Sequence, residues 1–510
     1  MNKKLFLVMT FLLIASMLVA CGGQKPTGEG NSQKPDGGTE ESQQPESTGD
    51  SDEESAGEKG AEPVEIKWAT WENAYMANEM AEKFNKQNPD IKVVVQQAAW
   101  FGNTELAKWA ASGEMPDVFA VENPFLGIQN GWLYDLKPFL DKETDPKFYD
   151  NFVETGTYNG KVYMLPSYIY VHGIIVNKSL LEANNIPVPG YDWTIDDYAN
   201  ILTSTTKDQT VGTNGITDLP KHIPPQMNDD LGWGCWDGSK YVLGDEWIHA
   251  VNFTKDLHDK NVALWQIEEG MQDPWVLEAG ADQDAAVQAI KNKYKEKYGE
   301  EENYNIFLKG NVATWMEFSW GIFFEENEKY SGFDWDFYPF PVVEKGDVSR
   351  PGIVCDSIAM LANTEHPEAA YKFIKYLSFD PASFDDRVEV IDNYDPKTAK
   401  EKYPDLAEDQ FPEYFSFSHI PAINDQTVRD KWCEYTKVKP GVKYIIDNLD
   451  TGYIDGFKYV PDFDTAYHKT IDKAMREQIF TGQKTAADLA AELEQKANEI
   501  TQEAVELMGD

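Results

Sequence analysis

Three short β-rich segments end in side chains suited to holding a small ligand. Segments 64–69, 91–95 and 117–121 have the composition of strands, and helical patterns separate them. The side chains that follow these segments are Trp71 and Glu72, Trp100 and Phe101, and Glu122 and Asn123. Strand–helix alternation predicts a parallel sheet, and such sheets bind ligands at the carboxyl ends of their strands. We therefore expect these aromatic rings, carboxylates and amides to meet at one edge of the sheet.

The segments between the expected strands have apolar residues at helical spacing, which predicts helices that pack against the sheet. Met76, Met80 and Phe84 recur every four residues, and residues 104–111 form a second helical segment. At the other end of the chain, Thr485 and Asp488 have the spacing of a capping box ahead of a long apolar stripe. The strand–helix order indicates an α/β fold, and the length indicates two sizeable lobes.

Two further groups of aromatic side chains are candidates for a ligand site. Tyr168 and Tyr170 alternate around Ile169, so both face one side of an extended segment. Trp233 and Trp236 lie in a glycine-rich stretch without a helical stripe. Two tryptophans in such a loop expose apolar area unless something covers them, and both a ligand and the protein core could do so.

The charge balance excludes several classes of partner. The chain has 510 residues, 88 acidic against 45 basic, and a formal charge of −43. No cluster of Lys and Arg offers a nucleic-acid site, and anionic lipid surfaces would repel the protein. A hydrophobic share of 41% and a mean hydropathy of −0.53 exclude a polytopic membrane protein. The same acidity argues against an anionic ligand.

The N-terminus has the sequence pattern of an export signal. Two lysines precede the apolar run 5–20, which is shorter than the ~20 residues of a membrane-spanning helix. The run ends Leu18-Val19-Ala20-Cys21 and resembles a bacterial lipobox, in which the cysteine receives diacylglycerol and becomes the first residue. An ordinary secretory signal is the alternative. Two or more acyl chains, such as palmitate, would give a stable anchor.

Residues 22–62 have the composition of a disordered tether. They contain no Val, Ile, Leu, Met or aromatic residue, and eleven acids stand against three lysines. Such a segment cannot bury enough apolar surface to offset its chain entropy. An interaction tail is the alternative. With 21–62 as anchor and tether, the remaining body carries about −37, since the signal contributes +2 and the tether −8 to the total of −43.

Metal and enzyme signatures are weak. Three cysteines remain after Cys21, so at most one disulfide can form, and none of their spacings matches a zinc site. Segment 447–455 is acidic but lacks the spacing of an EF-hand, which favours a solvated turn. The chain lacks G-x-S-x-G, H-E-x-x-H and Walker-type motifs. We expect no metal, no cofactor and no catalysis.

Seven segments in order resemble the family 1 extracellular solute-binding proteins, the sugar-capturing lipoproteins of ABC importers. The segments are 84–93, 113–118, 131–136, 159–166 with 175–178, 191–194, 308–313 with Trp320, and 366–373. The likeness spans about residues 64–380, and residues 215–303 match no pattern. It implies a monomer that passes a carbohydrate to membrane permease subunits, on the extracytoplasmic face of the cell membrane, with the long tether suggesting a Gram-positive surface.

The resemblance also implies an architecture. The expected fold is a two-lobed, periplasmic-binding-protein-like α/β fold of type II, with ligand bound in the cleft and hinge strands crossing between lobes. The crossings would fall near residues 167–172, 350–356 and 410–423. The N-lobe would comprise 63–168 plus 356–412, and the C-lobe 172–350 plus 418–510.

A sugar site needs aromatic faces for its C–H groups and convergent hydrogen-bonding groups for its hydroxyls. By the resemblance, Trp320 occupies the place of the family's stacking aromatic. The full set of expected ligand contacts is Trp71, Glu72, Trp100, Glu122, Asn123, Tyr168, Tyr170, Trp233, Trp236, Trp320 and Asp356, with Trp275 weaker and His172 a structural residue. The acidity favours a neutral oligosaccharide. A cell-surface glycoside hydrolase and a carbohydrate-binding adhesin are the alternative functions.

Overall fold

The computed structural model describes residues 62–98, 102–144, 147–267, 283–323 and 332–509. Cys21, most of the tether, Trp100 and Trp275 lie outside these ranges, and so do the predictions made for them. No helix within the described ranges combines the length and the apolar character needed to cross a membrane.

The predicted parallel sheet is present at the N-terminal end of the described chain. Strands β1 (Val64–Thr70), β2 (Ile91–Gln97) and β3 (Val118–Val121) alternate with helices α2 (Ala74–Gln87) and α3 (Gly102–Ser112). Strand β1 pairs in parallel with β2 and with β3. The stripe Met76, Met80 and Phe84 is buried, because these side chains face the sheet. The expected strand–helix order is thus confirmed.

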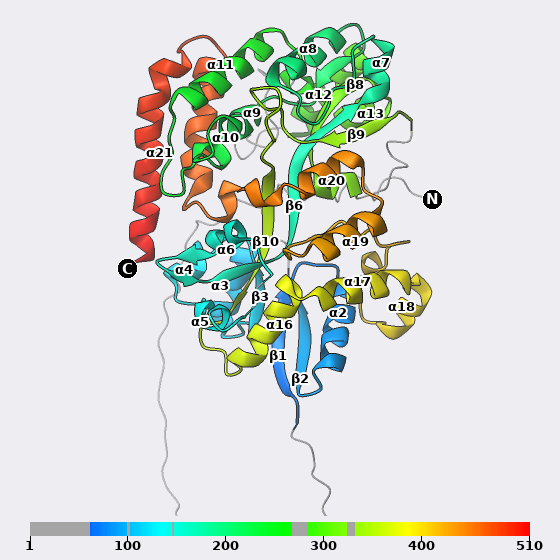
Figure 1. The fold of residues 1–510 in the computed structure, drawn as a ribbon, viewed down its shortest axis with the longest axis vertical. Helices are drawn as coiled ribbons and strands as arrows, with labels where there is room; N and C mark the ends of the chain where they lie inside the picture. The colour runs from blue at the N-terminus through cyan, green and yellow to red at the C-terminus, as the bar shows by residue number, and fades with distance from the viewer. Residues whose placement is uncertain (1–61, 99–101, 145–146, 268–282, 324–331, 510) are drawn as a thin grey trace, which may run out of the picture.

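Two long strands connect this region with the rest of the molecule. Strand β6 (Met164–Asn177) pairs along its first part with β10 (Gly352–Met360), and along its second part with β8 (Val312–Phe318) and β9 (Trp335–Tyr338). Short strand β11 (Ile420–Pro421) also pairs with β6, opposite Tyr168 and Ile169. The strand order is β2-β1-β3-β10-β6-β8-β7, with β7 spanning Val211–Thr213. In Figure 1, β6 and β10 run between two groups of elements, one at each end.

The remaining elements surround these strands. Those of the first half are α4 (Phe125–Gln129), α5 (Lys137–Leu140), α6 (Asp150–Thr155), β4 (Thr157–Tyr158), β5 (Lys161–Val162), α7 (Lys178–Ala183), α8 (Ile195–Thr205), α9 (Leu219–His222), α10 (Pro224–Met227), η1 (Trp233–Cys235) and α11 (Asp245–Asp259). Those of the second half are η2 (Leu264–Ile267), α12 (Gln283–Tyr298), α13 (Asn303–Leu308), α14 (Ser319–Phe323), α16 (Pro367–Phe379), α17 (Pro381–Asp392), α18 (Pro396–Lys402), η3 (Glu408–Gln410), α19 (Gln426–Thr436), α20 (Pro440–Ile446), η4 (Leu449–Thr451), β12 (Tyr453–Ile454), η5 (Gly456–Lys458), η6 (Asp464–Asp472), η7 (Met475–Ile479) and α21 (Ala486–Met508).

Segment 215–303, which matched no sequence pattern, builds part of a separate hydrophobic core. Trp236, Tyr241 and Trp247 are buried there together with Tyr467 and the apolar face of α21. The capping box of α21 forms as predicted, since Thr485 Oγ1 accepts from the Asp488 amide and the Asp488 carboxylate accepts from the Thr485 amide. Helix α21 lies along the outside of this group (Figure 1).

The structure also describes the three cysteines of the folded body and the acidic segment 447–455. Cys235, Cys355 and Cys433 are buried free thiols, so no pair of them forms a disulfide. The prediction that 447–455 is a solvated turn is wrong for its second half. Tyr453 and Ile454 are buried and form β12 in parallel with β10, because the strand needs a partner on that side. The predicted lobe boundaries remain predictions.

Candidate functional site

Four of the predicted site residues line one hollow beside strands β1, β6 and β10. Trp71 and Glu72 follow β1 directly, while Tyr168 on β6 lies opposite Asp356 on β10 in the antiparallel register. All four line a hollow of about 340 Å³, together with Ser167. The hydroxyl of Ser167 donates to the Asp356 carbonyl oxygen at 3.0 Å, which ties β6 to β10 at this point. The hollow therefore gathers residues that follow the carboxyl end of β1 and residues from the middle of the antiparallel pair β6 and β10.

Glu72 is held by an arginine that the sequence did not single out. Arg387 on α17 pairs with the buried Glu72 carboxylate through both ends of its guanidinium, with Nη2 3.3 Å from Oε2. His419 Nδ1 lies 3.6 Å from Glu72 Oε1. Burial alone would raise the pKa of Glu72, but the charges of Arg387 and His419 and the hydrogen bond from Arg387 together outweigh it, and the pKa is lowered. Glu72 is thus a charged, oriented carboxylate whose charge is balanced.

A second buried ion pair lies beside the first. Lys458 Nζ, on η5, is 2.9 Å from Asp356 Oδ1, and both side chains are almost fully buried. Burial alone would lower the pKa of Lys458, but Asp356 holds it above its ordinary value. Glu122, after β3, is 5% exposed. Burial raises its pKa, Lys458 opposes that rise, and among the described residues no group hydrogen bonds to its Oε1.

A row of aromatic rings continues from the hollow along β6. Tyr168 and Tyr170 meet edge to face at 5.7 Å between ring centroids, and Tyr170 meets Trp320 edge to face at 5.2 Å. Trp320 lies on α14, directly after β8. The Val171 amide donates to Ser319 Oγ at 3.1 Å, so the start of α14 is fixed against β6. Trp320 and Tyr168 remain partly exposed.

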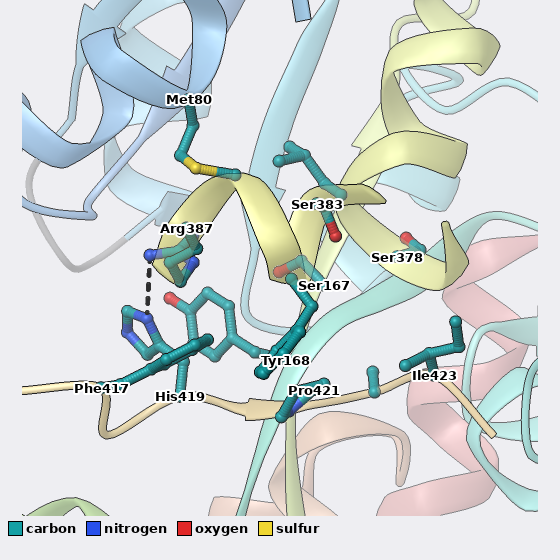
Figure 2. A pocket seen from close by; sticks show the side chains of 13 residues that line it. Met80, Ser167, Tyr168, Ser378, Ser383, Arg387, Phe417, His419, Pro421 and Ile423 are labelled. Atoms are coloured by element: carbon teal, nitrogen blue, oxygen red, sulfur yellow. Dashed lines mark hydrogen bonds between the residues drawn. The ribbon is translucent and has the colours of Figure 1, made fainter. Parts of the chain in front are cut away.

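A second hollow shares a wall with the first. It has a volume of about 430 Å³, part of which is open to solvent, and is bounded by α16, α17 and the β11 segment. Figure 2 shows Tyr168, Arg387 and His419 close together at one end, with Ser378 and Ser383 further along. The rings of Tyr168 and His419 stack at 4.1 Å. His419 is held neutral because burial lowers its pKa to about 4.

Some predicted residues lie elsewhere. Trp233 and Trp236 are 4% and 5% exposed and belong to the core that contains α21. The core covers their rings, so we correct their assignment as ligand contacts. Asn123 follows β3 as expected and is partly buried. Trp100 lies outside the described residues.

The sequence analysis did not predict the two basic residues of the site. None of the residues proposed from the sequence is a Lys or an Arg, yet Arg387 and Lys458 both reach the site. Each neutralises a carboxylate, so the site still carries no cationic surplus. The chain has only four arginines, but Arg387 directly follows Asp385 and Asp386, so its sequence surroundings gave no sign that it is buried. Within the described ranges no three His, Cys, Asp or Glu side chains are arranged to hold a metal ion.

An α/β fold whose long strands run between two groups of elements, with an aromatic and acidic hollow beside those strands, is an arrangement suited to holding a small solute. The sequence model of the bacterial extracellular solute-binding proteins matches residues 69–382, more than half of the chain. The chain therefore belongs to the bacterial extracellular solute-binding protein family. Members of this family are receptors and not enzymes, which confirms the expectation of a non-catalytic protein.

Solved structures share the fold. One is the substrate-binding protein Lmo0181 of Listeria monocytogenes in complex with cycloalternan, with a TM-score of 0.58, 19% identity, and 86% of this chain and 99% of that chain covered. Another is the sugar-binding protein MalE of Xanthomonas citri, with a TM-score of 0.59, 14% identity and coverages of 87% and 99%. A third is the cyclic α-maltosyl-1,6-maltose binding protein of Arthrobacter globiformis, with a TM-score of 0.58, 15% identity, and 86% of this chain and 100% of that chain covered. A search of curated proteins gives no match.

Proposed function

We propose that this protein is the lipid-anchored substrate-binding component of an ABC importer and that it captures a neutral oligosaccharide between its lobes. The observation that carries the proposal is the row of Tyr168, Tyr170 and Trp320 beside the oriented carboxylates of Glu72 and Asp356. Aromatic faces pack against the C–H groups of a pyranose, and carboxylates accept hydrogen bonds from its hydroxyls.

The electrostatics of the site favour an uncharged ligand. Glu72 is balanced by Arg387, and Asp356 by Lys458, so neither ion pair offers free charge to a ligand. Burial favours the neutral form of Glu122. A uronate or a sugar phosphate would enter without a cation of its own, and burying an unpaired charge is costly.

The ligands of two proteins that share the fold agree with this class. Cycloalternan occupies the Listeria protein, and the GacH receptor of Streptomyces glaucescens was solved with acarbose. In our proposal the ligand bridges Trp71, Glu72, Asn123, Tyr168 and Asp356 on one side and Trp320 on the other. Closure about β6 and β10 would trap it, and the permease would read the closed form.

The proposal is tested by titrating the purified full chain, in detergent, with a panel of neutral and anionic oligosaccharides followed by calorimetry. A neutral oligosaccharide should bind saturably and be recovered intact by chromatography. A panel in which no neutral sugar binds at millimolar concentration, or in which only uronates and sugar phosphates bind, would contradict the proposal.

A further inference from the structure

The ring of Trp320 belongs to a stack that runs from the site into the core. Trp320 lies parallel to Phe318, with 4.1 Å between centroids and 10° between planes. Phe318 lies parallel to His172 on β6 at 4.0 Å and 8°. Three nearly parallel rings therefore form a column, of which Trp320 is the partly exposed end and His172 the buried end.

Strand β6 holds this column from two positions. Tyr170 and His172 are two residues apart and so face the same side of the strand. Tyr170 meets the edge of Trp320, while His172 supports the face of Phe318. The orientation of Trp320 is therefore fixed both by an edge contact and by a stack.

His172 is itself held by a buried hydrogen-bonded chain. Its Nδ1 lies 2.8 Å from His222 Nε2, and His222 Nδ1 lies 2.7 Å from the Tyr453 hydroxyl. A neutral imidazole has one donor and one acceptor nitrogen, so His222 can serve both neighbours without any charge. Burial lowers the pKa of both histidines, and Lys221 adds to this lowering while Asp218 opposes it, so the pair stays neutral.

The Tyr453 end of this hydrogen-bonded chain lies beside strand β10. Tyr453 belongs to β12, which pairs with β10 at Gly352. A Cβ on Gly352 would lie 3.0 Å from His222 Cε1 and 3.0 Å from Trp233 Cζ3, so the strand backbone packs directly against these rings. The buried chain thus links β10 and β12 to the ring column.

We propose that His172, held by His222 and Tyr453, is a positioning residue for Trp320 and fixes, through Phe318, the orientation in which Trp320 meets the ligand. This inference rests on the proposed function of Trp320 as the stacking ring. Other known contacts of His172 fit the same role, because Trp233 flanks it at 5.8 Å and Phe340 closes the side at 5.0 Å. Trp233, which we no longer assign as a ligand contact, thus packs behind His172 at the buried end of the column.

The test is a double-mutant cycle in the full chain, read by calorimetry with the neutral oligosaccharide that binds best. His172→Asn keeps a hydrogen-bonding side chain and removes the ring, and should weaken binding about tenfold or more. His172→Phe restores the ring that supports Phe318 but gives up the hydrogen bond to His222, and it should bind more tightly than His172→Asn and more weakly than the wild type. Phe318→Leu removes the middle ring at a partly exposed position and should weaken binding like His172→Asn, which provides the test if His172→Asn does not fold.

In a Trp320→Ala background both changes should lose their effect on affinity, because the ring that they position is gone. The emission assigned to Trp320, from the difference between a protein and its Trp320→Phe form, should shift in His172→Asn. Leu106→Ala, a truncation in the separate core around Phe119, serves as the control and should shift neither affinity nor this emission.

Wild-type affinity in both His172→Asn and Phe318→Leu would overturn the inference. So would a loss of affinity that persists undiminished in the Trp320→Ala background, since it would show a general effect on folding. If Trp320→Ala itself binds like the wild type, the proposed function of Trp320 has failed, and this outcome is distinct from the other two.

Discussion

At the scale of residues, the buried ion pair between Arg387 and Glu72 gives a direct prediction about stability. Arg387 and Glu72 are each about nine-tenths buried or more and neutralise one another. Arg387→Met would leave a buried carboxylate without its cation, and breaking such a pair costs about 3–5 kcal/mol. Urea unfolding should show this loss of unfolding free energy.

An exposed ion pair on the same helix supplies the control. Lys431 pairs with Asp385 of α17 at 3.0 Å, but both side chains are more than half exposed. Lys431→Met should therefore cost less than about 1 kcal/mol. Equal losses in the two variants would show that the Arg387–Glu72 pair is not buried as described.

The pH dependence of stability reports on His172. Burial holds its pKa at about 4 in the folded protein, whereas an unfolded histidine titrates near pH ~6.5. The unfolded chain thus binds this proton first, so the contribution of neutral His172 is complete above that pH and is lost as the pH falls toward about 4.

His172→Phe removes this titration. Between about pH 7 and about pH 4 the wild type should lose more unfolding free energy than His172→Phe does. Glu317, whose pKa burial raises to about 7, acts with the opposite sign, but it is present in both proteins and cancels in the difference. If the two proteins instead lose the same unfolding free energy over this pH range, the His172 ring is not buried in the folded protein.

At the scale of elements, the close approach of α20 to β9 depends on one glycine. A Cβ on Gly441, in the first turn of α20, would lie 1.8 Å from the Phe337 carbonyl oxygen. Neither backbone can move freely, because the Gly441 amide also donates to Asp336 Oδ1 at 3.2 Å. Gly441→Ala should lower the unfolding free energy by about 3 kcal/mol or more.

Gly215 offers the matched comparison. A Cβ there would meet nothing within 4 Å, and its backbone conformation suits any residue. Gly215→Ala should change stability by no more than about 0.5 kcal/mol. Thermal unfolding midpoints of the two variants test the pair, and a tolerated Gly441→Ala would mean that α20 does not touch β9.

Local patterns predicted the elements better than they predicted the site. The strands and helices of residues 64–121 and the α21 capping box follow from spacing within a few residues. Arg387 and Lys458 reach the site from segments more than 300 and 100 residues away from their partners Glu72 and Asp356. Such pairings depend on how the chain crosses between groups of elements, and spacing along the sequence does not encode them.

Trp233 and Trp236 illustrate the same limit. Their glycine-rich surroundings gave no periodicity, so sequence could not decide between ligand and core. The structure decides because η6, η7 and α21, all far along the chain, close over them. In contrast, Tyr168 and Tyr170 were correctly placed on one side of a strand, since alternation along β6 is a local property.

At the scale of the whole molecule, we expect Cys21 to anchor the protein. Cys21→Ser removes the only thiol at the lipobox-like sequence and should release the protein from the membrane fraction, because acyl chains supply the attachment. Cell fractionation measures this, with Cys433→Ser in the folded body as the control. A Cys21→Ser protein that stays with the membrane would contradict lipidation at this site.

The central claim is that the aromatic row at the crossing strands grips a neutral oligosaccharide, and Trp320 tests it most directly. The measurement is calorimetric titration of the wild type, Trp320→Ala and Trp132→Ala with the same oligosaccharide. Trp132 is also a partly buried tryptophan, but it packs in the small core around Leu133, away from the row. We predict that Trp320→Ala binds more than about tenfold more weakly while Trp132→Ala binds like the wild type. Wild-type affinity in Trp320→Ala would contradict the claim.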